Sequence, residues 1–157
     1  HALAKARGTQ VRYVKPHGAM YNTIVHHEAQ AKAVIEGIKA FGTDLPVMLL
    51  PGAVAATYAE KAGLRVINEV FADRAYNPDG TLVSRRENGA VLHDPEVVAR
   101  RVVRMAEEGT IEAIDGSTIR TTADSVCVHG DSPGAVAMAE RIAAELKAND
   151  ITIGSFL

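Results

Sequence analysis

Residues 125–134 read Ser125-Val-Cys-Val-His129-Gly-Asp-Ser-Pro-Gly134, and this stretch decides the fold class. The apolar run that ends at His129 is typical of a buried strand, and the glycine and proline that follow interrupt it. Helical periodicity begins directly afterwards, because apolar residues recur at positions 135, 139, 142, 143 and 146. The stretch therefore predicts a strand (Ser125 to His129), a short loop and a covering helix.

The same alternation of strand and helix runs back toward the N-terminus. Further strands are predicted at Val11 to Val14, Val47 to Leu50 and Arg65 to Phe71. Helices are predicted over residues 31–41 with Asn22 as N-cap, over residues 54–62, and after the Asp94-Pro95 pair, where a cap precedes proline at the first helical position. Asp115-Gly116 between two short apolar runs predicts a hairpin.

Strands that alternate with helices imply an α/β fold, in which helices cover a mainly parallel sheet. We expect a single domain over residues 1–157, either a doubly wound open sheet or part of a β/α barrel. Residues 1–8 read as the last two turns of a helix without its start, which favours the barrel. We therefore expect an incomplete β/α barrel that is the C-terminal portion of a longer protein.

Composition narrows the class of protein. Lys and Arg number 17 against 19 for Asp and Glu, which gives a net charge of -2 and argues against a nucleic-acid partner. The longest apolar run, residues 47–56, is too short for a membrane span, so no membrane partner is expected. Cys127 is the single cysteine, which excludes an internal disulfide, and a cytoplasmic location is expected.

Function in parallel α/β folds collects at the carboxyl ends of the strands. That rule selects four loops: Lys15-Pro-His17-Gly18, Pro51-Gly52, Glu69 to Tyr76, and His129-Gly-Asp131. The second loop offers only backbone, for close approach of a ligand or as a plain turn. Each of the other three has a structural alternative, respectively a tight strand exit, an ion pair and a helix cap.

The loops carry residue types suited to proton transfer and anion binding. Lys15 can hold an anionic oxygen, and a neutral imidazole such as that of His17 or His129 can accept a proton near pH 7. Arg74, beside carboxylates at the end of its strand, can bind a substrate carboxylate through two hydrogen bonds.

Residues 130–134 match the pattern G-x-S-x-G of an esterase nucleophile, but this interpretation fails. The residue after Ser132 is Pro133, which has no amide to donate to an oxyanion, and no histidine follows His129 in the sequence. Ser132 is better interpreted as a helix N-cap with Pro133 at the first helical position. His129 and Asp131 then lie at a helix N-terminus, where anions bind well.

Metal and nucleotide sites have little support in the sequence. A divalent metal held by His17, His129 and Asp131 is chemically possible, although these ligands come from distant loops without local spacing. Neither of the two glycine-rich phosphate-binding patterns occurs. Metal content therefore stays unknown, and a self-contained nucleotide site is not visible in the sequence.

Three segments taken together resemble the LamB/YcsF family in order and spacing. They are Lys15-Pro-His-Gly-Ala-Met-Tyr-Asn22, Glu69-Val-Phe-Ala-Asp-Arg-Ala-Tyr76 with Asn77-Pro-Asp-Gly-Thr-Leu82, and Val128-His-Gly-Asp-Ser-Pro-Gly-Ala135. The resemblance covers nearly the whole chain and corresponds to roughly the C-terminal three-fifths of a family member. It implies an incomplete β/α barrel of the glycoside hydrolase/deacetylase type.

The resemblance also implies a reaction: as the A component of an ATP-dependent 5-oxoprolinase, the protein opens 5-oxo-L-proline to L-glutamate. ATP is then used through the full complex with partner subunits B and C, and a homo-oligomer is possible. Two alternatives stay open, a non-catalytic subunit that binds a small carboxylate or docks partners, and a metal-dependent deacetylase-like hydrolase.

Roles follow from that reaction as hypotheses. His129 or His17 is the base that activates water, Asp131 orients it, and Asp73 is the acid for the ring nitrogen. Lys15 lies near the carbonyl or phosphoryl oxygen, and Arg74 binds the substrate carboxylate. The remaining predicted substrate-binding residues are Glu69, Gly52 and Tyr76.

Overall fold

Strand β2 (Val66–Phe71) is the middle strand of the main sheet, whose order is β1-β2-β5. In this computed structural model, residues 1–131 and 133–157 are described. The chain forms two compact units, residues 1–67 with Leu157 and residues 68–156. The boundary between the units falls within β2.

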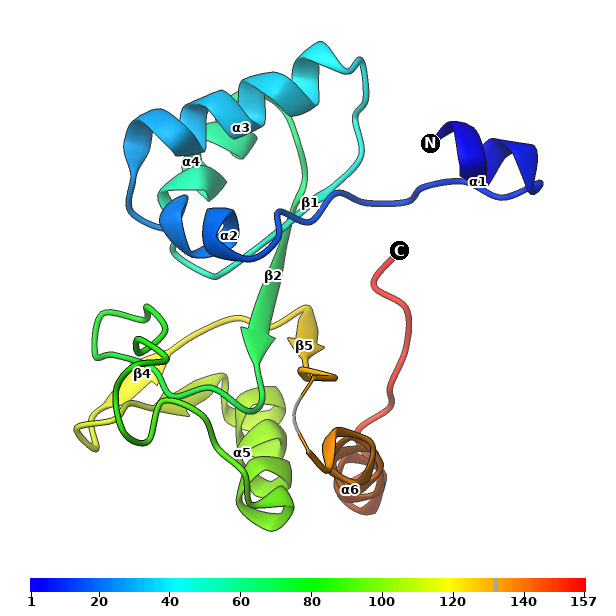
Figure 1. The fold of residues 1–157 in the computed structure, drawn as a ribbon. Coiled ribbons are helices and arrows are strands. Elements are labelled where there is room, and N and C mark those ends of the chain that lie inside the picture. Colours follow the sequence, from blue (N-terminus) through cyan, green and yellow to red (C-terminus); the bar gives the residue numbers. More distant parts are fainter. Residues whose placement is uncertain (132) are drawn as a thin grey trace. The chain divides into compact units, whose positions relative to one another are not determined.

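The N-terminal unit packs two helices beside a short strand. After α1 (Ala2–Ala6) and α2 (Ala19–Thr23), α3 (Glu28–Ala40) and α4 (Val54–Lys61) pack against each other and lie side by side in Figure 1. Strand β1 (Val47–Leu49) is fully buried. Ile24, Ala31, Ile35, Val47, Leu49, Ala55, Ala59 and Leu64 form one buried apolar cluster. Apolar residues at helical spacing on α3 thus bury the face that the sequence predicted.

In the C-terminal unit, β5 (Ser125–Cys127) pairs in parallel with β2. Glu69 lies opposite Ser125, and Phe71 lies opposite Cys127. β3 (Thr110–Glu112) and β4 (Thr118–Arg120) form an antiparallel hairpin around Asp115-Gly116, which confirms the predicted turn. The predicted α/β class, a parallel sheet with helices, is therefore confirmed, and the sheet of the described residues is open.

Helices α5 (Pro95–Glu108) and α6 (Ala135–Ala148) pack side by side (Figure 1). The Asp94 carboxylate accepts the amide hydrogens of Glu96 and Val97, and Gly109 ends α5 with φ 62°. Their buried faces meet in a cluster formed by Ala72, Val98, Ala99, Val102, Val103, Met138, Ile142 and Leu146. Because Ala72 belongs to this cluster, the helix pair packs directly against the segment that follows β2.

The predicted strand at residues 11–14 and the predicted N-cap of α3 were wrong. Residues 11–14 make only a single parallel bridge, Val14 to Val47, and the side chains of Arg12 and Tyr13 before it are exposed. Pro16 has no amide hydrogen with which to continue the pairing beyond Val14. Asn22 lies inside α2, and the N-cap of α3 is His27, whose Nδ1 accepts the Gln30 amide hydrogen at 3.3 Å. The parallel direction predicted for Val14 and Val47 is confirmed.

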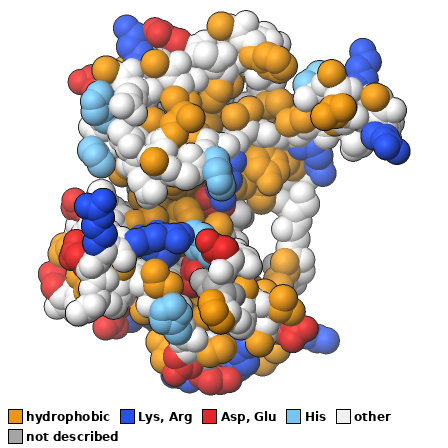
Figure 2. All heavy atoms as spheres, in the orientation of Figure 1, with side chains coloured by type: hydrophobic (Ala, Val, Ile, Leu, Met, Phe, Trp, Pro, Cys, Tyr) orange, Lys and Arg blue, Asp and Glu red, His pale blue; other side chains and the backbone are white. Residues whose placement is uncertain are grey.

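The start of α6 also differs from the prediction. The helix begins at Ala135 with Gly134 as N-cap at φ 79°, so Pro133 precedes the helix rather than opening it. The predicted cap Ser132 lies outside the described residues. Among the described residues, every helix is too short or too polar to cross a membrane. On the face of the C-terminal unit drawn in Figure 2, acidic and basic side chains are interspersed.

Candidate active site

A histidine and an aspartate meet just beyond the paired ends of β2 and β5. Phe71 and Cys127 are opposite each other in the parallel register, and Asp73 and His129 each lie two residues further along. The Ala72 amide still donates to the Cys127 carbonyl at 2.9 Å, so the backbone pairing of the two strands reaches the turn that carries Asp73. His129 Nδ1 is 2.9 Å from both Asp73 Oδ1 and Oδ2.

The surroundings of this pair differ between its two members. The Asp73 side chain is 4% exposed, whereas that of His129 is 21% exposed. The imidazole stacks on Phe71 with the ring centroids 5.5 Å apart and the planes at 23°. The carboxylate is thus buried behind the ring, and the imidazole keeps access to solvent. When the proton lies on Nδ1, facing Asp73, the other ring nitrogen is a free base.

Arg74 fixes the loop that carries Asp73. Its side chain is buried, with Nε donating to the Ala90 carbonyl at 3.2 Å and Nη2 donating to the Val83 carbonyl at 2.6 Å. Burial lowers its pKa, and the positive charge of Arg85 lowers it further. These bonds favour a structural role for Arg74 over the predicted contact with a substrate carboxylate, because the guanidinium is occupied by backbone.

Tyr76 closes the same loop from the other end. Its hydroxyl oxygen accepts the Phe71 amide hydrogen at 2.8 Å, and the residue is 2% exposed. Burial raises the pKa of Tyr76 to about 12. This internal contact favours a structural role for Tyr76 rather than the predicted contact with substrate.

Backbone bonds hold the loop along its length. The Ala72 amide donates to Cys127, and the Leu92 amide donates to the carbonyl of Asp73 itself, both at 2.9 Å. The Ala75 amide donates to Ala90 at 3.0 Å. The Asp73 carboxylate is therefore presented by a segment whose polar groups are bonded on both sides.

Asp131 was predicted to orient His129, and the structure instead gives that contact to Asp73. Asp131 is exposed, two residues past His129, in the loop before α6. The physical reason is the strand register, because it pairs Phe71 with Cys127, and Asp73 and His129 each follow two residues later. Asp73 is accordingly a hydrogen-bond partner of the imidazole, and its role as the acid for a ring nitrogen stays a prediction.

The other predicted residues divide between the two units. Lys15, His17 and Gly52 are exposed and belong to the N-terminal unit, where the Lys15 Nζ lies 5.8 Å from the centre of the Tyr21 ring. Glu69 is 3% exposed and lies in the part of β2 that belongs to the C-terminal unit. The roles assigned to these four residues stay predictions.

No group of three or more His, Cys, Asp or Glu side chains within residues 1–131 and 133–157 is placed to hold a metal ion. The His129 and Asp73 pair supplies one nitrogen and one carboxylate, which is fewer than the three protein ligands of a catalytic zinc site. Within the described residues, the arrangement is an imidazole and carboxylate pair.

Sequence inspection missed one residue that shapes this site. Arg101 of α5 donates to the carbonyls of Ala72 and Arg74, on either side of Asp73. The available signal was its position on the helix: residue 101 lies three residues from the buried Val98, so an arginine there faces the core side of the helix. An arginine on that face must find acceptors, and loop carbonyls are the usual ones.

The fold and this pair define a class: an α/β protein with a solvent-accessible histidine, backed by a buried carboxylate, at the carboxyl ends of parallel strands. The sequence profile of the LamB/YcsF family matches residues 1–157, so the chain belongs to the LamB/YcsF family.

Individual relatives agree with this assignment. The chain is 97% identical over 156 residues to the A component of 5-oxoprolinase from Corynebacterium jeikeium, covering 99% of this chain and 60% of the relative. It is 63% identical over 155 residues to a protein of the same name from Kocuria rhizophila, covering 99% of this chain and 62% of the relative. The chain thus spans about three-fifths of the length of these relatives.

A solved structure shows the same fold. The crystal structure of a lactam utilization protein from Thermus thermophilus matches with a TM-score of 0.88 and 39% identity. The match covers 97% of this chain and 60% of that protein.

Proposed function

We propose that this chain belongs to the lactam-opening component of an ATP-dependent 5-oxoprolinase, which hydrolyses 5-oxo-L-proline to L-glutamate. Family membership and the names of the relatives support the substrate class. The observation that carries the chemistry is the 2.9 Å contact between His129 Nδ1 and the Asp73 carboxylate. A pair of this kind provides a base for water and holds it in one tautomer.

In the proposed reaction, His129 Nε2 removes a proton from water as its oxygen bonds to the lactam carbonyl carbon. The ring C–N bond then breaks, and the imidazolium returns the proton to the leaving nitrogen, which becomes the amino group of glutamate. Asp73 keeps the Nδ1 proton in place throughout and stabilises the imidazolium while it exists. In this assignment His129, rather than Asp73, protonates the nitrogen.

An unactivated lactam resists this attack because amide resonance must be lost and an amine is a poor leaving group. Coupling to ATP hydrolysis with partner subunits B and C supplies activation of the carbonyl: the terminal phosphoryl group of ATP is transferred to the carbonyl oxygen and ADP leaves. Ring opening by the first water then leaves an acyl phosphate, and a second water hydrolyses it to the free carboxylate and phosphate. This chain has neither glycine-rich phosphate-binding pattern, which agrees with nucleotide binding in the complex rather than here. Lys15 stays a predicted contact for the carbonyl or phosphoryl oxygen.

The test uses the full-length Corynebacterium jeikeium relative with its partner subunits, with residues numbered as in this sequence. We expect glutamate and phosphate to be released only when both 5-oxoproline and ATP are present. His129→Asn should lower kcat by about 10²–10⁴-fold. His93→Asn, at an exposed position before α5, is the matched control and should turn over normally. Wild-type protein that forms no glutamate from 5-oxoproline would contradict the proposal.

A further inference from the structure

Arg101 reaches from α5 to the loop that carries Asp73. Its Nη1 donates to the Ala72 carbonyl at 3.2 Å and to the Arg74 carbonyl at 2.5 Å. The carbonyl between them, that of Asp73, accepts the Leu92 amide hydrogen at 2.9 Å. Three successive carbonyls around the aspartate are thus bonded, and one guanidinium group holds the outer two.

The same guanidinium is held in place by Tyr76. Its central carbon lies 5.4 Å from the centre of the Tyr76 ring, within the range of a cation–π contact. The Tyr76 hydroxyl oxygen in turn accepts the amide hydrogen of Phe71, the residue stacked on His129. Burial lowers the pKa of Arg101, which agrees with a charge withdrawn from solvent.

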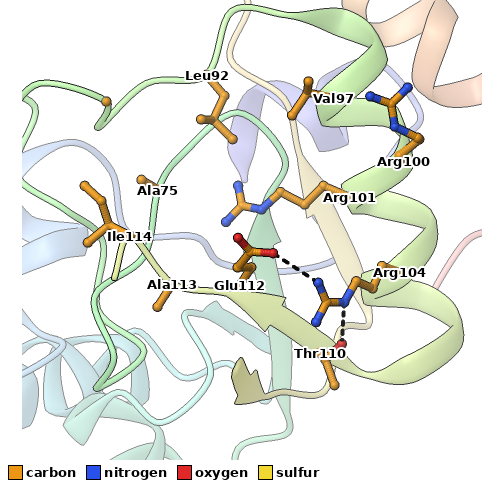
Figure 3. A pocket seen from close by; sticks show the side chains of 11 residues that line it. Ala75, Leu92, Val97, Arg100, Arg101, Arg104, Thr110, Glu112, Ala113 and Ile114 are labelled. Atoms are coloured by element: carbon orange, nitrogen blue, oxygen red, sulfur yellow. Dashed lines mark hydrogen bonds and ion pairs between the residues drawn. The ribbon is translucent and has the colours of Figure 1, made fainter. Parts of the chain in front are cut away.

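Figure 3 shows Arg101 extending from α5 into a pocket of about 440 Å³, toward Ala75 on the far side. Arg104, one turn further along α5, lines the same pocket, but its side chain contacts other partners than the loop around Asp73. Its guanidinium pairs with Glu108 at 3.2 Å and Glu112 at 3.3 Å. The two arginines share a helix and a cavity, and only Arg101 contacts the loop around Asp73 in the described residues.

We propose that Arg101 is a positioning residue for the His129 and Asp73 pair, which it serves by fixing the two carbonyls that flank Asp73. The proposal rests on the proposed function for its kinetic part. Without this donor, the carbonyls of Ala72 and Arg74 would lose their acceptor bonds to Arg101, and the 72–73 and 74–75 peptides would rotate to find other donors. The carboxylate moves with those peptides, and both of its oxygens must stay near Nδ1 to hold the imidazole.

Displacements of about 1 Å in a catalytic group can lower rates by about 10²-fold. Arg101→Met keeps the long stem but removes every donor, so kcat should fall about 10–100-fold while KM changes less than about twofold. Arg101→Lys restores a donor and should recover kcat to within about fivefold of wild type. Arg104→Met is the matched control and should leave kcat unchanged, because its lost partners are Glu108, Glu112 and Thr110.

A second measurement does not depend on turnover. Spectra of ¹⁵N-histidine-labelled, full-length Corynebacterium jeikeium protein report which ring nitrogen of His129 carries the proton. Wild type, Arg101→Lys and Arg104→Met should show the proton on Nδ1, facing Asp73. Arg101→Met should show a mixture of tautomers.

The outcomes separate this proposal from the proposed function. Wild-type protein without 5-oxoproline turnover counts against the function, while the histidine spectra still decide the role of Arg101. A methionine variant with wild-type spectra overturns the positioning role, even when its melting temperature is lower. If Arg101→Met does not fold, Arg101→Gln is measured instead. Histidine spectra and a kcat equal to those of wild type in that variant would also overturn the proposal.

Discussion

The two loops that meet at the His129 and Asp73 pair are built differently. The loop after β2, residues 72–76, is buried throughout, and arginine, tyrosine and backbone donors bond its polar groups. The described part of the loop after β5 is exposed from Gly130 to Gly134, with Asp131 facing solvent. One loop therefore presents a carboxylate in a fixed place, while the other carries the imidazole to the surface.

This difference shows how an imidazole and carboxylate pair can be both ordered and accessible. A buried carboxylate that is held by its own backbone keeps one position without help from substrate. The imidazole is oriented by its Nδ1 contact with Asp73 and by stacking on the Phe71 ring. Substitutions in the two loops should accordingly have unequal effects.

The largest effect is expected for Asp73→Asn. The amide keeps the shape of the carboxylate but cannot stabilise an imidazolium, so kcat in the reconstituted enzyme should fall by about 10²–10⁴-fold. The fold should survive, because the amide is nearly isosteric with the carboxylate. Turnover within about threefold of wild type would show that His129 works without this partner.

Arg74→Met should affect stability most. The variant loses two hydrogen bonds from a charged, buried donor to the Val83 and Ala90 carbonyls, each worth about 1.5–3 kcal/mol. Urea unfolding should show a loss of about 3 kcal/mol or more. Arg86→Met, at an exposed position, is the control and should change stability by less than about 0.5 kcal/mol. Equal stability of the two variants would contradict the structural role of Arg74.

Tyr76→Phe should have a smaller effect with a distinctive pH dependence. At neutral pH it leaves the buried Phe71 amide without its acceptor, which costs about 1–3 kcal/mol. In the folded protein the pKa of Tyr76 is about 12, above the ordinary value of 10.0. Between these two pH values the unfolded chain releases this proton while the folded chain keeps it.

Wild-type stability should therefore be fully present below about pH 10 and fall as pH rises toward about 12, by up to about 1.4 kcal/mol per pH unit from this residue. Tyr76→Phe lacks this contribution, so the stability difference between the two proteins should shrink across that range. Chemical unfolding of both proteins at about pH 9, 10 and 11 measures this stability difference. A constant difference over these pH values would mean that the Tyr76 pKa is not raised.

The smallest effect is expected for Asp131→Asn. Because Asp131 is exposed and Asp73 supplies the contact to His129, kcat should change by less than about tenfold. The comparison of Asp131→Asn with Asp73→Asn in one assay sharpens the contrast between the loops. A larger loss for Asp131→Asn would restore the hypothesis that Asp131 orients the base.

Much of the fold could be predicted because its signals are local. Asp94-Pro95 and Gly109 mark the ends of α5 through cap chemistry, and Asp115-Gly116 marks the hairpin turn. The segment 11–14 was predicted wrongly because a strand needs a partner along its length, and only Val14 pairs. Propensity within one segment does not report on that partner.

The sequence predicted which residues lie at the site better than it predicted which of them contact each other. The strand-end rule selected both Asp73 and His129, yet it assigned Asp131 to the histidine because Asp131 is near in sequence. Which carboxylate faces the imidazole depends on strand register, a property of two segments far apart in the sequence. Arg74 was predicted to bind substrate for a similar reason. Its hydrogen-bond acceptors are the carbonyls of Val83 and Ala90, and the sequence does not show that these lie beside it.

A double-mutant cycle on Asp73 and His129 tests most directly whether the two residues act as one unit. The four proteins are wild type, Asp73→Asn, His129→Asn and the double variant, compared by kcat in the reconstituted full-length enzyme. Residues that act together are strongly non-additive, so the double variant should be no slower than His129→Asn alone. Losses that multiply would contradict the pairing of Asp73 with His129 in catalysis.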